Sequence, residues 1–365
     1  MNPEHVHDVI VVGAGPAGSA CAGFLAGKGL DVLLIDRARF PREKICGDCL
    51  HPRSWTILRE LNAAEPVRNA PHRTIDGIRI VSWTGRSAHS PLKTAPGREL
   101  VSIARSILDD ILARTAEKSG ARFIQETQLL RVEPGNPLRV MTRGPHGEKS
   151  LRCRYLVGAD GRNSAVAASV DHERRNHPDR VGLQWFTSFQ PMLDRDILLA
   201  ILPWGYFGVV NLEEGKANVA MALDPRRGPV SPERVTAALV ETFRSNELLG
   251  DLTPRSEVLT TSPINPRTRA SRHGRIFLAG DAERTVEPFT GEGIAFALES
   301  GRRVASQILA LAKQTPLAPL PAPGSFRVNK IFSPVLRHPI IANIALAPIA
   351  RSTRLFDLAL RGMFR

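Results

Sequence analysis

The chain begins with two short apolar stretches that flank a segment of small residues. Residues 8–12 (DVIVV) and 31–36 (DVLLID) have the composition of buried strands. Between them, a glycine-rich turn leads into residues 16–27, which are small and predict a helix that begins at Pro16. The order strand, turn, helix, strand is that of a nucleotide-binding unit.

Farther along the chain, apolar and polar residues alternate in the manner of half-buried strands. This alternation covers residues 74–83 (TIDGIRIVSW) and 181–223, with a predicted hairpin around Gly215. We expect these segments to form a mostly antiparallel sheet that covers the nucleotide site.

Two more apolar strands end in a glycine and an acid. Residues 155–157 precede Gly158-Ala159-Asp160-Gly161, and residues 276–279 precede Gly280-Asp281. An acid directly after a strand can accept hydrogen bonds from ribose or ribityl hydroxyls. The segment Pro288–Ile294 then begins a helix whose glycine-rich start presents backbone N–H groups and a positive dipole end.

These patterns predict an α/β fold with a Rossmann-type nucleotide-binding domain, a second domain built on the mostly antiparallel sheet, and a helical C-terminal tail. The predicted boundaries are residues 5–75, 100–175 and 265–312 for the nucleotide-binding domain, 76–99 and 176–264 for the sheet domain, 313–324 for a Pro-rich linker, and 325–365 for the basic tail.

Composition places the chain among globular proteins. It has 365 residues, of which 42% are hydrophobic, and four cysteines. The N-terminus lacks the features of a signal peptide, and no apolar run reaches the ~18 residues that span a bilayer. We therefore expect a cytoplasmic protein, soluble or peripheral to a membrane.

The net charge of +13 is large. No zinc-finger spacing or long basic block accompanies it, so we expect no nucleic acid partner. The tail contains seven basic residues and one acid, Asp357. It is interpreted as a terminal helix packed on the core, or as a surface for an anionic membrane or an acidic protein.

The first turn contains the G-x-G-x-x-G pattern at Gly13, Gly15 and Gly18. The first glycine permits the turn, the second lets the backbone approach a pyrophosphate, and the third allows close packing of helix on strand. Asp36 ends the second strand. A carboxylate at this position accepts hydrogen bonds from ribose hydroxyls, and its charge repels a 2′-phosphate. The ligand is therefore expected to be FAD or NAD rather than NADP.

The three glycine motifs together resemble the fingerprints of the para-hydroxybenzoate-hydroxylase-like FAD superfamily. FPREKICGDCLHPR is similar to a stretch of its geranylgeranyl-reductase-like branch, and the segment from Arg105 is similar to a family helix that begins with an FAD-contacting arginine. The resemblance covers residues 8–310 and implies an FAD-dependent oxidoreductase with extended FAD. The expected FAD contacts are Gly13, Gly15, Pro16, Ala17, Gly18, Asp36, Arg37, Lys44, Cys46, Gly47, Arg105, Asp160, Gly280, Asp281, Gly291, Gly293 and Ile294.

Cys46 and Cys49 form a C-x-x-C pair. A flavin-coupled disulfide is disfavoured because the chain lacks a second G-x-G-x-x-G, and zinc is disfavoured because no matching ligand pair lies elsewhere. We favour a turn that packs beside the flavin, with Cys49 as a packing residue. Whether Cys46 takes part in chemistry stays open, and no metal site is predicted.

The substrate wall is expected to be apolar or aromatic. Trp185, Trp204, Tyr206 and Phe289 are the candidate pocket residues. No catalytic side chain is assigned, because a flavin performs its own chemistry. His51 and Glu292 are the best candidates for proton transfer, but we interpret both as structural residues.

Two reaction classes fit these motifs, and both use NAD(P)H as the expected electron donor. An O2-dependent monooxygenase that hydroxylates or epoxidises a small apolar or aromatic molecule is favoured. Reduction of C=C bonds in a prenyl chain is the alternative. It ranks second because the chain departs from the substrate motif of the reductases: Gly208 stands where that motif has tryptophan, and no Phe-Pro follows. Ala167 also stands where both groups have arginine. A flavoprotein maturation partner that docks to an acidic protein is the third hypothesis.

Overall fold

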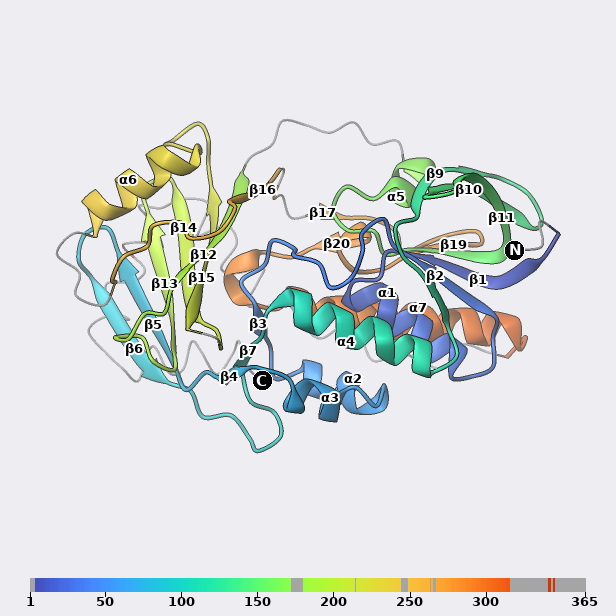
Figure 1. Ribbon diagram of the computed structural model, residues 1–365, viewed down its shortest axis with the longest axis horizontal. Helices are drawn as coiled ribbons and strands as arrows, with labels where there is room; N and C mark the ends of the chain where they lie inside the picture. Colours follow the sequence, from blue (N-terminus) through green and yellow to red (C-terminus); the bar gives the residue numbers. More distant parts are fainter. Residues whose placement is uncertain are drawn as a thin grey trace.

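The computed structural model describes residues 4–171, 180–213, 215–243, 249–262, 264, 267–315, 341–342 and 344. The described chain forms two sheets that lie beside one another, with most of the helices packed on the sheet that contains the N-terminus (Figure 1). The predicted α/β architecture is confirmed. Most of the predicted linker and nearly all of the basic tail lie outside the described residues.

The first sheet has parallel strands at its centre. Its strand order is β18-β19-β11-β1-β2-β8, and β10 and β9 extend antiparallel from β11. Its strands are β1 (Val6–Val12), β2 (Val32–Ile35), β8 (Arg122–Ile124), β9 (Gln128–Glu133), β10 (Leu138–Gly144), β11 (Gly147–Gly158), β18 (Arg272–His273) and β19 (Ile276–Leu278).

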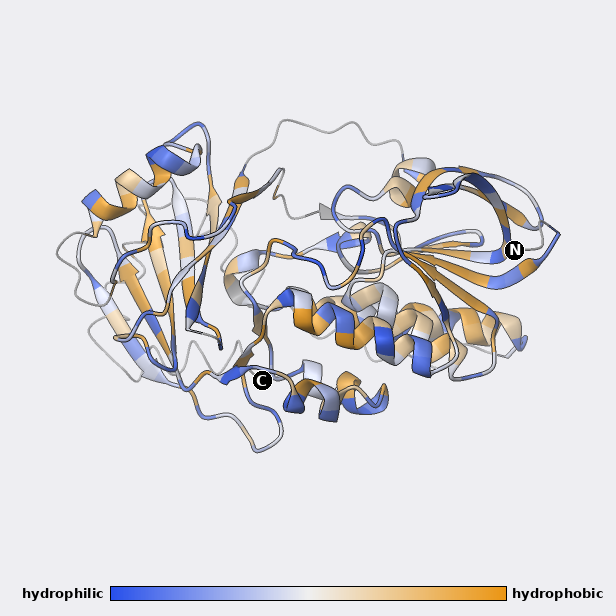
Figure 2. Ribbon diagram, in the orientation of Figure 1, coloured by the Kyte–Doolittle hydropathy of each residue, from blue (hydrophilic) through white to orange (hydrophobic). Residues whose placement is uncertain are grey.

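Both faces of this sheet are buried. Val9 and Val11 of β1 enter one hydrophobic core, and Ile10 and Val12 enter the other. A strand buried on both faces has a continuous apolar sequence, which explains why residues 9–12 do not alternate. The ribbon coloured by hydropathy shows the same apolar strands at the centre of the sheet (Figure 2).

Helices α1, α4 and α7 lie side by side on one face of the first sheet (Figure 1). Helix α5 packs against β9 and β11, and α2 and α3 pack against α7 and α4. The helices are α1 (Pro16–Ala26), α2 (Ser54–Glu60), α3 (Ala64–Asn69), α4 (Arg105–Lys118), α5 (Ala165–Val170), α6 (Pro232–Thr242) and α7 (Gly293–Ala312). Two 3-10 turns, η1 (Gly280–Ala282) and η2 (Pro288–Thr290), precede α7.

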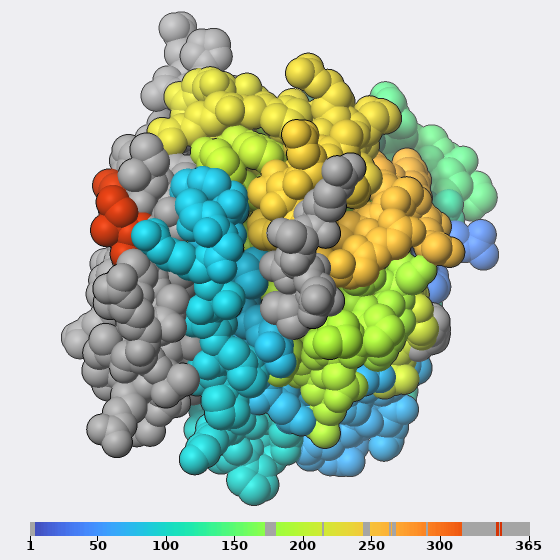
Figure 3. All heavy atoms as spheres, turned by 90° about the vertical axis from the view of Figure 1, so that its left-hand side faces the viewer, coloured from blue at the N-terminus to red at the C-terminus, as the bar shows by residue number. Residues whose placement is uncertain are grey.

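The second sheet has the order β16-β12-β15-β14-β13-β5-β6 and is antiparallel except where β13 pairs with β5. Helix α6 covers its outer face, and Figure 3 shows this end of the molecule, with α6 in yellow near the top. The strands are β5 (Gly77–Ser82), β6 (Ser87–Pro91), β12 (Val181–Ser188), β13 (Asp196–Leu202), β14 (Gly205–Asn211), β15 (Lys216–Leu223) and β16 (Leu259–Thr261).

Short strands complete the described chain. A three-stranded sheet, with β7 paired to both β3 and β4, joins segments near the boundary of the two large sheets, and β17 pairs with β20. Their bounds are β3 (Cys49–Leu50), β4 (Arg73–Thr74), β7 (Val101–Ser102), β17 (Arg267–Thr268) and β20 (Arg284–Thr285). Among the residues described, no helix combines the length and the hydropathy needed to cross a membrane.

Candidate cofactor and substrate site

A large cavity lies between the carboxyl ends of the first sheet and the inner face of the second sheet. Glycine-rich turns after β1, β11 and β19 contribute to one wall, and strands β5, β13, β14 and β15 contribute to the other. In an open α/β sheet, ligands bind outside the carboxyl ends of the strands, so this cavity is the candidate site.

The turn after β1 is packed too closely to accept side chains at two of its glycines. A Cβ on Gly13 would lie 2.4 Å from the carbonyl oxygen of Ala159, and one on Gly18 would lie 1.8 Å from that of Gly13. Gly13 also has a φ of +99°, which favours glycine. Gly15 differs, because its nearest neighbour outside the turn is Arg42 Nη2 at 3.7 Å. The turn therefore leaves a cradle of backbone at Gly15 that lines the cavity.

Helix α1 begins directly behind this cradle. Gly15 is its N-cap, and the lining residues Pro16 and Ala17 form its first turn, with no acidic side chain there. The free N–H groups and the positive dipole end of a helix N-terminus attract phosphate. These features fit the pyrophosphate of a dinucleotide.

Asp36 supports the turn from the end of β2. Its carboxylate accepts hydrogen bonds from the backbone N–H groups of Ala14 at 2.8 Å and Ala38 at 2.9 Å. Arg42 Nη2 lies 3.9 Å from the same carboxylate. Asp36 does not line the cavity itself, and the neighbouring Arg37 is exposed.

Arg105 is the first residue of α4 and lines the cavity although it is 5% exposed. It donates two hydrogen bonds to Asp109, at 2.8 and 2.7 Å. Burial opposes the charge of Arg105, but Asp109 and Cys46 together outweigh that effect and raise the arginine's pKa. The cavity thus holds a permanent cation on this side.

Lys44 lies on the same side of the cavity. Burial, and then the neighbouring charge of Arg105, lower the pKa of its ammonium group. An anionic ligand placed between two cations of this kind would offset their mutual repulsion.

The turn after β19 forms another part of this wall. Gly280 has a φ of +61°, and its N–H donates to Ser300 Oγ at 2.8 Å. Asp281 lines the cavity, with Arg162 Nε 3.8 Å from its carboxylate. Gly291, Gly293 and Ile294 line it as well, so the N-terminus of α7 faces the cavity.

Asp160 is oriented differently from what the sequence predicted. Its carboxylate accepts hydrogen bonds from Ser164 Oγ at 2.5 Å and from the N–H groups of Ala165 and Val166 at the start of α5. Burial outweighs these bonds and raises the pKa of Asp160. The side chain holds α5 in place, and it is the neighbouring Gly161 and Arg162 that line the cavity.

The segment with the two cysteines is held by the second sheet. The N–H of Cys46 donates to Gln184 Oε1 at 2.8 Å, and Asn218 Nδ2 donates to the carbonyl of Cys46 at 2.8 Å. Cys46, Gly47 and Cys49 all line the cavity, and all four cysteines of the chain are free. Burial raises the pKa of the Cys46 thiol, which keeps it protonated.

Asp48 is the unusual member of this segment. It is 1% exposed, has a φ of +52°, and neither carboxylate oxygen has a hydrogen-bond partner within the described chain. Burial raises its pKa well above the ordinary value, although the charge of Arg105 acts in the opposite direction. His51, in the same segment, is fully buried, and Glu292 is buried beside Arg53.

The opposite wall is apolar. Its side chains come from the inner face of the second sheet and from neighbouring loops. They include Ile78, Ile197, Leu199, Val210, Ile264 and Phe289.

Tyr206 is the polar exception on this wall. Its hydroxyl donates a short hydrogen bond to Glu287, which also accepts two bonds of 2.8 Å from Arg180. Glu287 is fully buried, and the Tyr206 ring packs edge-on against Phe289. Burial, followed by the Glu287 carboxylate, raises the pKa of Tyr206, so its phenol is neutral.

The structure places two predicted pocket residues elsewhere. Trp185 belongs to the core under α6, where its indole N–H donates to the carbonyl of Leu252 at 2.8 Å. Trp204 packs at the edge of the same core. Trp185 misses the cavity because neighbouring residues of a strand point to opposite faces and Trp185 occupies the outer face. Trp204 misses it because it lies in the turn between β13 and β14.

Most of the predicted cofactor residues line the cavity, but Gly13, Gly18, Asp36, Arg37 and Asp160 do not. Sequence reasoning missed Arg162 on the lining, and Arg180 and Glu287 behind Tyr206. Arg162 directly follows the Asp160-Gly161 turn, which was a usable signal. Arg180 and Glu287 are 107 residues apart, and no local pattern joins them.

Comparison with known proteins agrees with this geometry. Residues 6–316 match a protein-family model described as FAD binding domain. The chain is 31% identical over 387 residues to menaquinone reductase of Mycobacterium tuberculosis, covering 100% of this chain and 92% of the relative. It is 28% identical over 313 residues to digeranylgeranylglycerophospholipid reductase of Methanosarcina acetivorans, covering 82% and 74%.

Solved structures share the fold at lower identity. A flavoprotein/dehydrogenase of Cytophaga hutchinsonii superposes with a TM-score of 0.75 at 20% identity, covering 86% of this chain and 80% of the other. Aklavinone-11 hydroxylase, in a ternary complex with FAD and aklavinone, gives a TM-score of 0.70 at 24% identity, covering 86% and 64%.

Proposed function

The chain belongs to the FAD binding domain family and is an FAD-dependent oxidoreductase, and on this premise we propose that it reduces a C=C bond in the isoprenoid chain of a lipophilic substrate. The sequence alone favoured a monooxygenase. The relatives that match most of the chain shift the preference to reduction, because their names denote reductases whose substrates contain isoprenoid chains.

The observation that carries the proposal is the contrast between the two walls of the cavity. Backbone turns and the cations Arg105 and Lys44 fit a dinucleotide on one side, whereas the other side is a surface of aliphatic side chains. A hydrocarbon chain gains about 25 cal/mol for each Å² that it buries against such a surface. The same wall excludes water from the reacting bond.

In this proposal the residues of the chain position and shield the reactants. Gly15, Ala17 and the start of α7 would hold the cofactor, with Arg105 and Lys44 beside it. Bound FAD would supply the hydride equivalent for this reduction, with NAD(P)H as the proposed electron donor, and the second carbon of the bond would take up a proton. Cys46 Sγ holds a proton at the cavity, since burial keeps the thiol neutral, whereas the proton of Tyr206 is donated to Glu287 behind the wall.

The test uses the purified FAD-bound protein without oxygen. The flavin is reduced with NADH or NADPH in separate samples and mixed with menaquinone or a geranylgeranyl lipid, and the products are analysed by mass spectrometry. We expect a product that has gained two hydrogen atoms per reduced bond, together with reoxidation of the flavin. Absence of both with every substrate, although the flavin is reduced, contradicts the proposal.

Monooxygenation is the second candidate, and Gly208 favours it because this position lacks the tryptophan of the reductase motif. The same mixtures are repeated in air. Incorporation of one oxygen atom into the substrate, with no reduction under anaerobic conditions, selects the monooxygenase. No chemistry under either condition selects the flavoprotein maturation partner.

We also propose that the basic tail brings the protein to an anionic surface, either a membrane or an acidic protein. Each basic residue near an acidic bilayer contributes about 1 kcal/mol, and salt screens the attraction. Co-sedimentation with anionic liposomes should therefore be lost at high salt and in a form truncated after Gly324. Equal sedimentation of both forms contradicts a role of the tail at a membrane.

A further inference from the structure

Two histidines and an aspartate meet at the edge of the first sheet opposite the cavity. His5 precedes β1, His7 is its second residue, and Asp31 immediately precedes β2. Strands β1 and β2 are parallel, with Val9 opposite Val32, so both strands begin at the same edge. In Figure 1 this edge lies beside the N-terminus, at the end of the molecule far from the second sheet.

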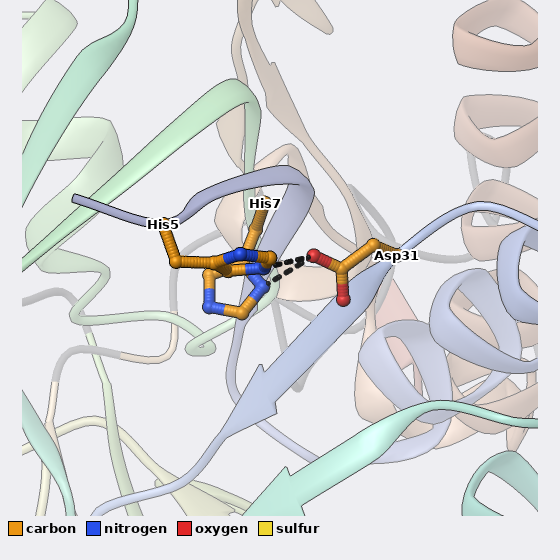
Figure 4. Close-up of side chains that lie close together, drawn as sticks. All are labelled: His5, His7 and Asp31. Atoms are coloured by element: carbon orange, nitrogen blue, oxygen red, sulfur yellow. Dashed lines mark hydrogen bonds and ion pairs between the residues drawn. The ribbon is translucent and has the colours of Figure 1, made fainter. Parts of the chain in front are cut away.

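The three side chains converge on one point (Figure 4). His5 Nε2 lies 2.7 Å and His7 Nδ1 lies 2.8 Å from the same atom, Asp31 Oδ2. The centroids of the two imidazole rings are 4.5 Å apart, and the ring planes are nearly perpendicular. Residues i and i+2 of an extended segment point to the same side, which is why both rings reach Asp31.

The surroundings hold one side of this cluster fixed and leave the other open. The side chain of His7 is 6% exposed, whereas those of His5 and Asp31 are 53% and 44% exposed. The N–H of Asp31 donates to Asp8 Oδ2 at 3.0 Å, its carbonyl accepts from Val9, and Asp8 pairs with Arg154. The backbone of Asp31 is therefore anchored, and water can reach the cluster from outside.

We infer that His5, His7 and Asp31 form a binding site for a divalent transition-metal ion of the Zn2+ type. The site offers two imidazole nitrogens and one carboxylate oxygen, all within 4.8 Å of one another. Imidazole suits Zn2+, Cu2+ and Ni2+, whereas Mg2+ and Ca2+ require more oxygen ligands than this site provides. Water reaching the open side completes a tetrahedral set.

The distances permit this occupancy with a small adjustment. Metal–ligand bonds of about 2.0–2.1 Å at tetrahedral angles separate two ligand atoms by roughly 3.3 Å. The present separations of 2.7 and 2.8 Å are hydrogen-bond distances, so the ligands must move apart by a few tenths of an ångström. His5 and Asp31 are the exposed members and can provide this movement while His7 stays fixed.

A bound ion would join the start of β1 to the turn between α1 and β2. An ion that binds only the folded chain stabilises it by mass action. Because the cavity lies at the opposite edge of the sheet, occupancy should leave the FAD site unchanged. The inference is therefore independent of the reaction proposed above.

The experiment uses the FAD-bound full chain without a polyhistidine tag, freed of metal by a chelator and dialysed. ZnCl2 is titrated by calorimetry, with MgCl2 as the comparison salt, and unfolding temperatures are recorded with and without ZnCl2. The variants are His5→Gln and Asp31→Asn, both at exposed positions. His146→Gln, at an exposed position in the turn between β10 and β11, is the matched control.

We expect one Zn2+ per chain, no comparable binding of Mg2+, and a higher unfolding temperature with Zn2+. His5→Gln and Asp31→Asn should each weaken binding by more than about tenfold, and His146→Gln should leave it unchanged. All variants should retain the flavin spectrum. The inference is overturned if the wild-type chain does not bind Zn2+. It is also overturned if His5→Gln and Asp31→Asn bind Zn2+ as strongly as the wild type.

Discussion

The two walls of the cavity are built in different ways. On the first sheet the wall consists largely of turns and helix starts, and its shape depends on backbone at Gly13, Gly15 and Gly280. On the second sheet the wall consists of strand side chains such as Leu199 and Tyr206, whose neighbours Leu198 and Phe207 enter a separate core. A turn is specified by a few adjacent residues, whereas a wall of strands depends on which face each residue occupies.

The sharpest way to test the first wall is to compare two glycines of the same turn. Gly13→Ala places a Cβ 2.4 Å from Ala159 O at a positive φ, whereas Gly15→Ala meets only Arg42 at 3.7 Å. We expect Gly13→Ala to weaken FAD binding by about 100-fold or more, which corresponds to about 3 kcal/mol. Gly15→Ala should fold normally and weaken FAD binding through its Cβ in the cradle.

Flavin retention during dialysis and thermal unfolding of the apoprotein measure both effects. If Gly13→Ala retains FAD as well as the wild type, the close packing of this turn does not shape the site.

Behind the second wall, the buried pair of Arg180 and Glu287 should matter more than an exposed pair. Arg180→Ala leaves the buried Glu287 carboxylate without its bidentate partner, which costs about 3–5 kcal/mol. Arg143→Ala, whose partner Glu148 is about half exposed, should cost at most about 1 kcal/mol. Urea denaturation of the FAD-bound forms provides the comparison, and equal costs would show that burial of the Arg180 pair has no special role.

Two adjacent residues of β13 separate the two faces of the second sheet. Leu198 is fully buried in the core under α6, and Leu199 lines the cavity. Leu198→Ala should destabilise the fold by about 2–5 kcal/mol and leave the KM of the isoprenoid substrate unchanged. Leu199→Ala should raise that KM with a smaller loss of stability.

Steady-state kinetics and urea denaturation are measured on both of these variants. A higher KM in Leu198→Ala than in Leu199→Ala would contradict the placement of the substrate wall.

The smallest expected effect concerns the pH dependence of stability at Asp48. Its folded pKa is raised by burial, so the folded state binds a proton that the unfolded state has released above about pH 4. The stability that this proton provides is present below that pH and is lost as pH rises toward the folded pKa. Asp48→Asn should remove this loss, so its stability relative to the wild type should rise as pH increases from about 4 toward the folded pKa of Asp48.

Asparagine also tolerates the φ of +52° at this position, so the substitution tests charge rather than backbone conformation. Denaturation curves at several pH values measure the difference between the two proteins. A constant difference across this range would show that Asp48 is ionised in the fold.

Local sequence was sufficient wherever a function depends on a turn. The pattern Gly13-x-Gly15-x-x-Gly18, the acid Asp36 at the end of a strand and the helix start at Arg105 all predicted elements that the structure contains. The hairpin at Gly215 also joins β14 and β15 as predicted. Each of these features is set by the φ preferences or hydrogen-bonding groups of adjacent residues.

Local sequence was insufficient wherever a role depends on orientation. Asp160 stands at the predicted place in the chain, but its carboxylate turns to the start of α5. Trp185 stands in the predicted strand but faces the outer core. A shift of one residue reverses the face of a strand residue, and composition does not reveal which face a given aromatic occupies.

The sequence by itself determined the nucleotide-binding unit, the order of the two sheets along the chain and the polarity of the cofactor wall, because each depends on interactions between residues close in the chain. Only the tertiary structure decided that Tyr206, Glu287 and Arg180 form one network, that the Cys46 segment is held by Gln184 and Asn218, and that His5 and His7 meet Asp31. Those groups come from segments far apart in sequence. Their meeting depends on strand register and packing, which no local pattern of residues specifies.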